Sequence, residues 1–138
     1  MLIGSAVHNL DAKGRVVIPA KYRDDLGSTI FAFRSVDGCI RLYSYEQFQL
    51  LLDKLKDSDV SRLALRRKIS GSAEQLSIDG QGRILIPELL RKKVGITDKV
   101  RMVGMITWIE LWNEDGYDDD DNMTVEEEMQ AMAAIGLS

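Results

Sequence analysis

Two arginines, Arg15 and Arg83, each follow a glycine and stand four positions after an aspartate. A guanidinium is a planar fork of donors that matches phosphate or the O6/N7 edge of guanine. An arginine beside a sharp turn, present twice, therefore indicates that the chain binds a polyanion. The two motifs lie 68 residues apart and read Asp11-Ala12-Lys13-Gly14-Arg15-Val16-Val17-Ile18-Pro19 and Asp79-Gly80-Gln81-Gly82-Arg83-Ile84-Leu85-Ile86-Pro87.

The motif alone leaves the role of its arginine open. Gly14 and Gly82 allow a positive φ, so the chain can turn sharply at both places. The preceding aspartate can accept backbone N–H bonds or pair with the arginine four positions on. A complete, dry pair would make the arginine structural, whereas a partial, exposed pair would leave it free to bind. Lys13 favours binding in the first copy, and Gln81 takes its place in the second.

The charges are segregated along the chain, although the net formal charge is −4. Residues 111–138 contain nine acids and no Lys or Arg. Residues 1–110 carry 18 Lys and Arg against 13 Asp and Glu, an excess of five positive charges. The whole-chain charge therefore does not exclude nucleic acid as a partner of the basic body.

The remaining composition argues against an enzyme. His8 and Cys39 are the only residues of their types, so no disulfide framework, Cys-rich zinc pattern or Ser-His-Asp set is present. We expect no catalysis, cofactor or metal. No apolar stretch is long enough to span a bilayer, and Met1-Leu2-Ile3-Gly4 lacks the basic start of a signal peptide. We expect an intracellular chain with one core shared by both repeats.

The same elements are expected in both halves of the chain, in the same order. Pro19 and Pro87 each end a strand and start a short helix. Asp37-Gly38 is a strong hairpin signal. The first half is expected to hold strands 3–10 and 16–18, helix 20–26 and hairpin strands 29–34 and 39–43; the second half is expected to hold strand 83–86, helix 87–94 and hairpin strands 99–103 and 107–112.

Helices are expected between the halves and at the end. Phe48, Leu51, Leu52 and Leu55 share one face of a first helix, and Asp57-Ser58-Asp59 supplies the cap of a second, basic helix over 62–69. A terminal helix over 124–132 is expected to begin at a Thr124 cap.

Besides both motifs, the chain contains the segments Ile18-Pro19-Ala20-Lys21-Tyr22-Arg23, Leu89-Leu90-Arg91 and Glu110-Leu111-Trp112. Together these features resemble the MraZ family of bacterial transcriptional regulators of the division and cell-wall gene cluster. The resemblance covers residues 1 to about 115, including the helical insert. It implies a mainly β, α+β fold of two pseudo-symmetric AbrB/SpoVT-like swapped-hairpin modules around one β-barrel-like core. It also implies a ring-shaped homo-oligomer on tandem short promoter repeats.

From this resemblance we expect a cytoplasmic, nucleoid-associated DNA-binding regulator that represses its own operon. The expected units are a first module with its helix (1–56), a basic connector (57–70), a second module (71–116) and an acidic tail (117–138). The motif residues Asp11, Gly14, Pro19, Asp79, Gly82 and Pro87 are expected to be structural. The expected DNA-binding residues are Lys13, Arg15, Lys21, Arg23, Arg83 and Arg91, with Lys92 and Lys93 on adjacent phosphates.

Two alternatives remain from the sequence. The chain could be an oligomeric protein-interaction scaffold without direct DNA readout, anchored by Trp108, Trp112 and Tyr117. The acidic tail could compete with DNA for the basic body, and its run 118–121 could bind a divalent cation, although it lacks the pattern of an EF-hand loop.

Overall fold

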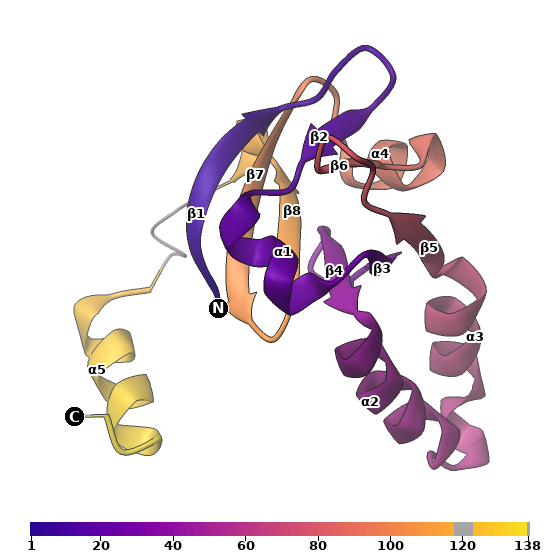
Figure 1. The fold of residues 1–138 in the computed structure, drawn as a ribbon. Coiled ribbons are helices and arrows are strands. Elements are labelled where there is room, and N and C mark those ends of the chain that lie inside the picture. Colours follow the sequence, from indigo (N-terminus) through magenta and orange to yellow (C-terminus); the bar gives the residue numbers. More distant parts are fainter. Residues whose placement is uncertain (118–122, 138) are drawn as a thin grey trace.

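The computed structural model describes residues 1–117 and 123–137, which form an α+β fold (Figure 1). Six strands make an antiparallel sheet in the order β1-β7-β8-β4-β3-β5, and β2 pairs with β6 as a separate two-stranded ribbon. The strands are β1 (Leu2–Asn9), β2 (Arg15–Val17), β3 (Thr29–Arg34), β4 (Ile40–Ser44), β5 (Glu74–Ser77), β6 (Arg83–Leu85), β7 (Lys99–Ile106) and β8 (Ile109–Asn113). The helices are α1 (Ala20–Leu26), α2 (Tyr45–Lys56), α3 (Leu63–Ser72), α4 (Glu88–Val94) and α5 (Val125–Ala134), with 3-10 turns η1 (Val60–Arg62) and η2 (Glu114–Gly116).

Each half of the chain pairs its first strand with the hairpin of the other half. β1 pairs with β7, from Leu2 opposite Ile106 to Asn9 opposite Lys99. β5 pairs with β3, and the hairpins β3–β4 and β7–β8 meet where β4 pairs with β8. The expected α+β fold of two swapped-hairpin modules is confirmed, in a sheet that is open at its edge strands β1 and β5.

Two residue pairs mark the pseudo-twofold axis between the halves. Val16 lies opposite Ile84, its counterpart in the second motif, in the β2–β6 ribbon. Arg41 lies opposite Glu110 where β4 pairs with β8, and each is the second residue of its strand. Since equivalent strands pair with each other, neither half completes its sheet alone.

One hydrophobic core serves both halves, as expected. The ribbon turns Val16 and Ile84 inward, and the centre of the sheet contributes Leu42 and Leu111. These four side chains are at most 1% exposed. Burial of apolar surface contributes roughly 25 cal/mol per Å² and is the main favourable term in folding. The ribbon that carries both motifs is therefore fixed by the core beneath it.

Aromatic side chains of the helical insert, α2 and α3, and of the sheet pack against each other. Phe48 of α2 stacks on Phe31 of β3 with ring centroids 4.6 Å apart. The expected apolar face of α2 is confirmed, because Phe48 and Leu55 are buried and Leu51 and Leu52 are half-buried. By contrast, α3 buries none of its side chains. The α2–α3 hairpin therefore stands out from the sheet (Figure 1).

Three elements differ from the sequence prediction. β5 is a strand that the sequence does not indicate, since only Leu76 of its four side chains is buried and its pairing with β3 defines it. β7 continues to Ile106 because β1 pairs along its whole length. Asp59 caps the single turn η1, accepting a hydrogen bond from the Ser61 N–H at 3.1 Å, and α3 follows that turn.

The terminal helix begins at its expected cap. The Thr124 hydroxyl accepts a hydrogen bond from the Glu127 N–H at 3.1 Å, and α5 continues to Ala134. Every side chain of α5 is exposed. The acidic run 118–121, with its cation hypothesis, lies outside the described residues. Among the residues described, no helix is long and apolar enough to cross a membrane.

Candidate nucleic-acid interface

Asp11 organises the first motif turn. Its Oδ1 accepts hydrogen bonds from the backbone N–H groups of Lys13 and Arg15, both at 2.9 Å. Its Oδ2 accepts a hydrogen bond from Arg15 Nε at 2.7 Å. The Gly14 N–H donates to the Asp11 carbonyl oxygen at 3.0 Å and closes the turn. One carboxylate therefore fixes both the turn and the direction of the arginine.

Asp79 repeats each of these bonds in the second motif. Its Oδ1 accepts hydrogen bonds from the N–H groups of Gln81 and Arg83 at 2.9 Å, and its Oδ2 accepts one from Arg83 Nε at 3.0 Å. The Gly82 N–H donates to the Asp79 carbonyl oxygen at 2.9 Å. The turn uses only the backbone of Gln81, so the side chain at this position is exposed and free to differ between the copies.

Gly14 and Gly82 are required for two separate reasons. Their φ values, +88° and +78°, lie in a region that other residues rarely adopt. A Cβ on Gly14 would also come within 2.6 Å of Arg91 Cζ, and a Cβ on Gly82 would overlap the guanidinium of Arg23. The sequence indicates the first requirement. It gives no sign of the second, because the arginine comes from the other half.

Pro19 and Pro87 position those two arginines. Each proline is the N-cap of its helix, with φ of −53° at the start of α1 and −54° at the start of α4. Proline has no N–H to donate to the ribbon and its fixed φ suits a helix start, so the strand ends and the helix begins at one residue. Arg23 and Arg91 follow one turn later, on the side of each helix that faces the motifs.

Arg23 and Arg91 are half-buried and act as braces between the halves. Arg23 Nε donates to the Ile18 carbonyl oxygen at 2.7 Å, and its guanidinium then lies over Gly82 of the other motif. Arg91 makes the equivalent bond to the Ile86 carbonyl oxygen at 3.0 Å. Each motif loop therefore carries the positive charge of an arginine from the opposite half.

The ribbon brings both motif arginines onto one face. Arg15 lies opposite Leu85 and Val17 lies opposite Arg83. Since side chains alternate along a strand, these four face outward while the residues between them enter the core. The Ile18 N–H to Gly82 oxygen bond (2.8 Å) and its symmetry equivalent (3.0 Å) extend the pairing on both sides. The two motifs thus make one composite surface.

Each motif arginine is paired and still accessible. The side chains of Arg15 and Arg83 are 31% and 26% exposed. In both, Nε is held by the aspartate of the same turn. Within the described chain, the terminal nitrogens of Arg15 have no hydrogen-bond partner, and Arg83 Nη1 lies 3.8 Å from Asp11 Oδ2. The pair that the sequence left open is therefore partial, because the aspartate holds Nε while part of each arginine side chain stays exposed.

The turns keep their carboxylates charged. The backbone N–H of Arg15, with the side chain of Arg15 and the N–H of Lys13, lowers the pKa of Asp11 to about 2. The backbone N–H of Arg83 is the main cause that lowers the pKa of Asp79. Both aspartates are therefore ionised at neutral pH, so the arginines stay oriented.

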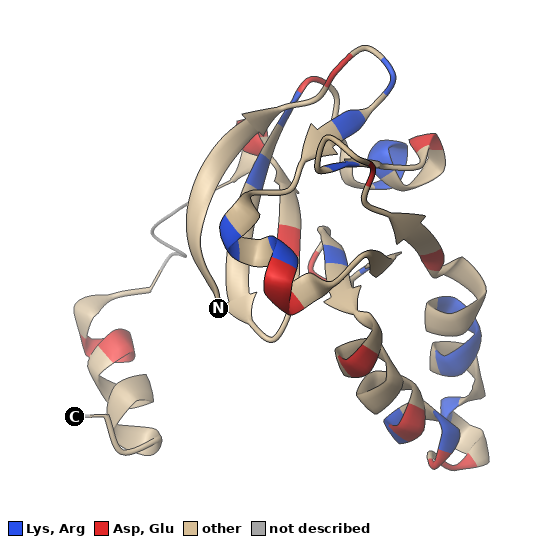
Figure 2. Ribbon diagram, viewed as in Figure 1, with Lys and Arg blue, Asp and Glu red and all other residues tan. Residues whose placement is uncertain are grey.

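Further cations surround the ribbon. Figure 2 shows Lys and Arg residues gathered at the motif loops, α1 and α4, and a second group on α3. Lys13 and Lys21 are exposed, and the Lys21 ammonium lies 5.0 Å from the centre of the Tyr22 ring. On α4, Lys92 pairs with Glu88 at 3.1 Å, with both side chains well exposed. Arg23 and Arg91 thus lie against the two motif turns, whereas the Lys21 ammonium lies beside Gly4 of β1.

Comparison with known proteins agrees with this architecture. The sequence profile of the family described as "MraZ protein, putative antitoxin-like" matches residues 1–68 and again residues 69–134. The chain belongs to the MraZ family. It is 38% identical to the transcriptional regulator MraZ of Acetivibrio thermocellus and 35% identical to that of Caldicellulosiruptor bescii, over 99% of this chain and 100% of each relative. It is 37% identical to the protein of the same name from a Thermoanaerobacter species, over 90% of this chain and 89% of the relative.

The tryptophans of this MraZ family member serve its own packing. The indole N–H groups of Trp108 and Trp112 both donate to Glu110, at 3.0 Å each. The Arg41 guanidinium lies 4.7 Å from the centre of the Trp108 ring, and Tyr117 packs on Trp112 with ring centroids 5.8 Å apart. Both half-buried tryptophans therefore lie on the same side of β8 as Glu110 and make contacts within the chain.

Cys39 and His8 are the two residues of this MraZ chain whose types the sequence analysis singled out for catalytic potential. Cys39 is buried beside the Ser35 hydroxyl, and burial raises the pKa of its thiol to about 11. Burial and the nearby Lys21 charge lower the pKa of His8, which lies on β1. In the described residues no group of His, Cys, Asp and Glu is arranged to hold a metal ion.

Proposed function

We propose that this chain is a sequence-specific DNA-binding transcriptional regulator that reads double-stranded DNA with its β2–β6 ribbon. The observation that carries the proposal is the placement of Arg15 and Arg83 on one outward face of the ribbon. The DNA major groove admits a two-stranded β-ribbon, and an arginine fork on guanine O6 and N7 is the commonest specific contact there. Val17 and Leu85, on the same face, suit the methyl groups of thymine.

The flanking cations are proposed to hold the DNA backbone. Asp11 and Asp79 offset the charges of the two motif arginines, so the attraction for phosphate must come from other residues. Cations around the groove fix register and orientation without carrying sequence information. The proposed set is Lys13, Lys21, Arg23 and Arg91, with Lys92 and Lys93 at the edge.

The proposal includes assembly into a ring-shaped homo-oligomer on tandem short repeats in the promoter of the division and cell-wall gene cluster, with repression of its own operon. One ribbon makes few contacts and binds weakly by itself. Several ribbons on properly spaced repeats gain affinity through effective concentration, most simply at about 10 bp spacing. The proposed units stay those of the sequence prediction: modules 1–56 and 71–116, connector 57–70 and tail 117–138.

The test measures binding of the chain to the DNA upstream of its own gene. Fluorescence anisotropy at several salt concentrations and footprinting together give affinity, salt slope and protected repeats. We expect Arg15→Ala or Arg83→Ala to abolish specific binding. Arg15→Lys keeps the charge but loses the fork, so it should retain nonspecific binding and lose discrimination between bases.

A matched control removes a cation far from the ribbon. Lys54 lies exposed on α2, and Lys54→Ala should bind the promoter as the unchanged chain does. Oligomer size and thermal unfolding are measured for each variant. If Arg15→Ala dissolves the oligomer or unfolds the chain, Arg15 is structural and the proposed role is wrong. If the unchanged chain ignores DNA at both low and high salt, the scaffold alternative stands.

A further inference from the structure

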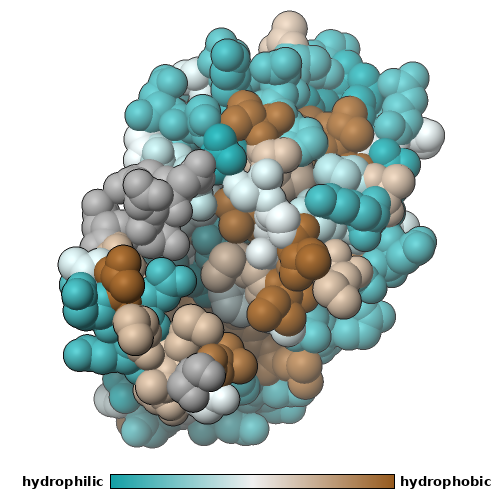
Figure 3. All heavy atoms as spheres, turned by 90° about the vertical axis from the view of Figure 1, so that its left-hand side faces the viewer, coloured by the Kyte–Doolittle hydropathy of each residue, from teal (hydrophilic) through white to brown (hydrophobic). Residues whose placement is uncertain are grey.

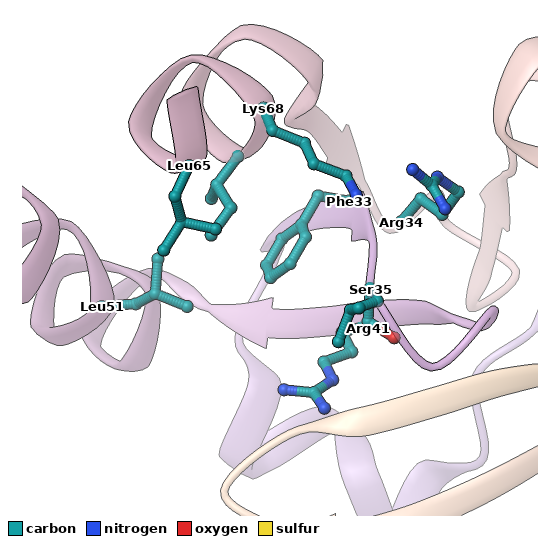
Figure 4. A pocket seen from close by; sticks show the side chains of 9 residues that line it. Phe33, Arg34, Ser35, Arg41, Leu51, Leu65 and Lys68 are labelled. Carbon is teal, nitrogen blue, oxygen red and sulfur yellow. The ribbon is translucent and has the colours of Figure 1, made fainter. Parts of the chain in front are cut away.

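An apolar hollow lies between the helical insert and the sheet. Phe33 of β3, Leu51 of α2, and Leu65 and Ile69 of α3 line a volume of about 160 Å³ (Figure 4). Small-molecule sites typically enclose roughly 300–1,000 Å³. The hollow is smaller than that range, so it suits inserted side chains better than a separate small molecule.

Two cations at this hollow have no anionic partner. Figure 4 shows the Lys68 side chain extending toward the guanidinium of Arg34. In the described part of the chain, no carboxylate lies within ion-pair distance of either. The third cation of the lining, Arg41, is already engaged, with Asp37 at 2.9 Å. An apolar floor beside two unpaired cations fits an acidic, amphipathic partner.

The chain itself contains such a segment in α5. Val125, Met129 and Met132 follow one another at i, i+4 and i+7, so they share one face of the helix. They are 40–69% exposed. Figure 3 shows apolar residues open to solvent on the side of the molecule where α5 lies. Glu126, Glu127 and Glu128 fill the first turn of α5.

We propose that α5 of one copy docks on the α2–α3 hairpin of a second copy, with methionine side chains in the hollow and its glutamates on Arg34 and Lys68. The charges of donor and acceptor are complementary, because residues 111–138 contain no Lys or Arg and α3 carries Arg66, Arg67 and Lys68. Apolar contact supplies most of the affinity, and the ion pairs select the partner.

A second copy suits this geometry because α5 and the α2–α3 hairpin lie on opposite sides of the molecule (Figure 1). Each copy would then offer one donor helix and one acceptor hollow. Such a head-to-tail contact makes a ring when the rotation between copies closes. The inference therefore rests on the proposed homo-oligomer, and it names the surfaces that join the copies.

The test is a charge swap read by light scattering and native mass spectrometry on full-length chains. The donor variant combines Glu126→Lys, Glu127→Lys and Glu128→Lys. The acceptor variant combines Arg34→Glu and Lys68→Glu. We expect each variant alone to fall from oligomer to monomer. An equimolar mixture should reassemble into alternating copies, because each reversed α5 then meets a reversed hollow.

A control variant and three possible outcomes distinguish the α5 contact from assembly of the ring. Lys99→Glu reverses an exposed cation on β7, outside the α2–α3 hairpin, and should leave the oligomer unchanged. A monomeric unchanged chain would contradict the ring. An unchanged chain that assembles while both swapped variants also assemble would contradict only the α5 contact. Failure of the mixture to reassemble, with both variants folded, would show that α5 docks within its own chain or elsewhere.

Discussion

The guanidinium of Arg23 lies over Gly82, and the two residues belong to opposite halves of the duplicated chain. Arg91 lies over Gly14 in the same way. Each brace is fixed by a hydrogen bond from its Nε to a carbonyl oxygen of its own half, Ile18 or Ile86. The loops that present the motif arginines are therefore held by the opposite module, so the two copies of the motif depend on each other.

Gly82→Ala should displace this brace. The new Cβ would overlap the Arg23 guanidinium, and φ at +78° is strained for alanine. We expect a loss of about 1–3 kcal/mol in the free energy of unfolding, measured by urea denaturation. Gly80→Ala is the control, since nothing lies within 4 Å of a Cβ there. Equal losses in the two variants would contradict the brace.

The sequence predicts the repeated elements well because they depend on local chemistry. The helix expected over 20–26 occurs as α1 at those residues, since Pro19 and Gly27 bound it. The Asp11 turn is also local, as its bonds span four residues or fewer. The sequence does not show β5, which depends on its pairing with β3.

The candidate site was predictable in its residues but not in its arrangement. The repeat identifies Arg15 and Arg83, but two separate sites and one shared ribbon give the same sequence pattern. The pairing of β2 with β6 decides between them. The sequence also does not reveal the contact of Arg23 with Gly82, because these residues are far apart in the chain and meet only when it folds.

The turn of Asp11 should weaken in acid. Its pKa is about 2 in the fold against an ordinary value of 3.8. A carboxyl with a lowered pKa stabilises the fold above its unfolded pKa, and this contribution is lost as the pH falls from about 4 to about 2. The carboxyl carbon shift of Asp11, followed by NMR, should titrate near pH 2.

Arg15→Gln tests the cause of that low pKa. The variant removes the side-chain bond to Asp11 but keeps the backbone N–H bonds of residues 13 and 15. The backbone N–H bond of residue 15 is the largest cause of the lowered pKa. We expect the pKa of Asp11 to rise only part of the way to 3.8. A full return to 3.8 would mean that the guanidinium, and not the turn, holds the charge.

Cys39 should be unreactive while the chain is folded. It is fully buried, and burial raises the pKa of its thiol to about 11, so little thiolate exists at pH 8. A thiol reagent should therefore label the native chain slowly and the urea-unfolded chain at once. Labelling should follow the opening of the core, and rapid labelling in native buffer would show that β4 is not packed as described.

The two motifs should contribute unequally to DNA binding. Lys13 and Gln81 make the same backbone bond to their aspartates, but only Lys13 adds a cation. If each phosphate contact contributes about 0.9 to the salt slope, Lys13→Gln should lower the slope by about that amount and Gln81→Lys should raise it. Anisotropy titrations at four salt concentrations measure both. Identical slopes in the three chains would place Lys13 away from phosphate.

Truncation of the acidic tail distinguishes two hypotheses about its role. Tyr117 packs on Trp112, so the truncation begins after it, at residue 118. If the tail competes with DNA for the basic body, the truncated chain should bind promoter repeats more tightly at low salt. If α5 joins copies, the same truncation should weaken binding to tandem repeats, because avidity is lost, and leave binding to a single repeat unchanged. We expect the second result, measured on one-repeat and multi-repeat DNA in parallel. Tighter binding to both DNAs would favour competition and contradict the α5 contact.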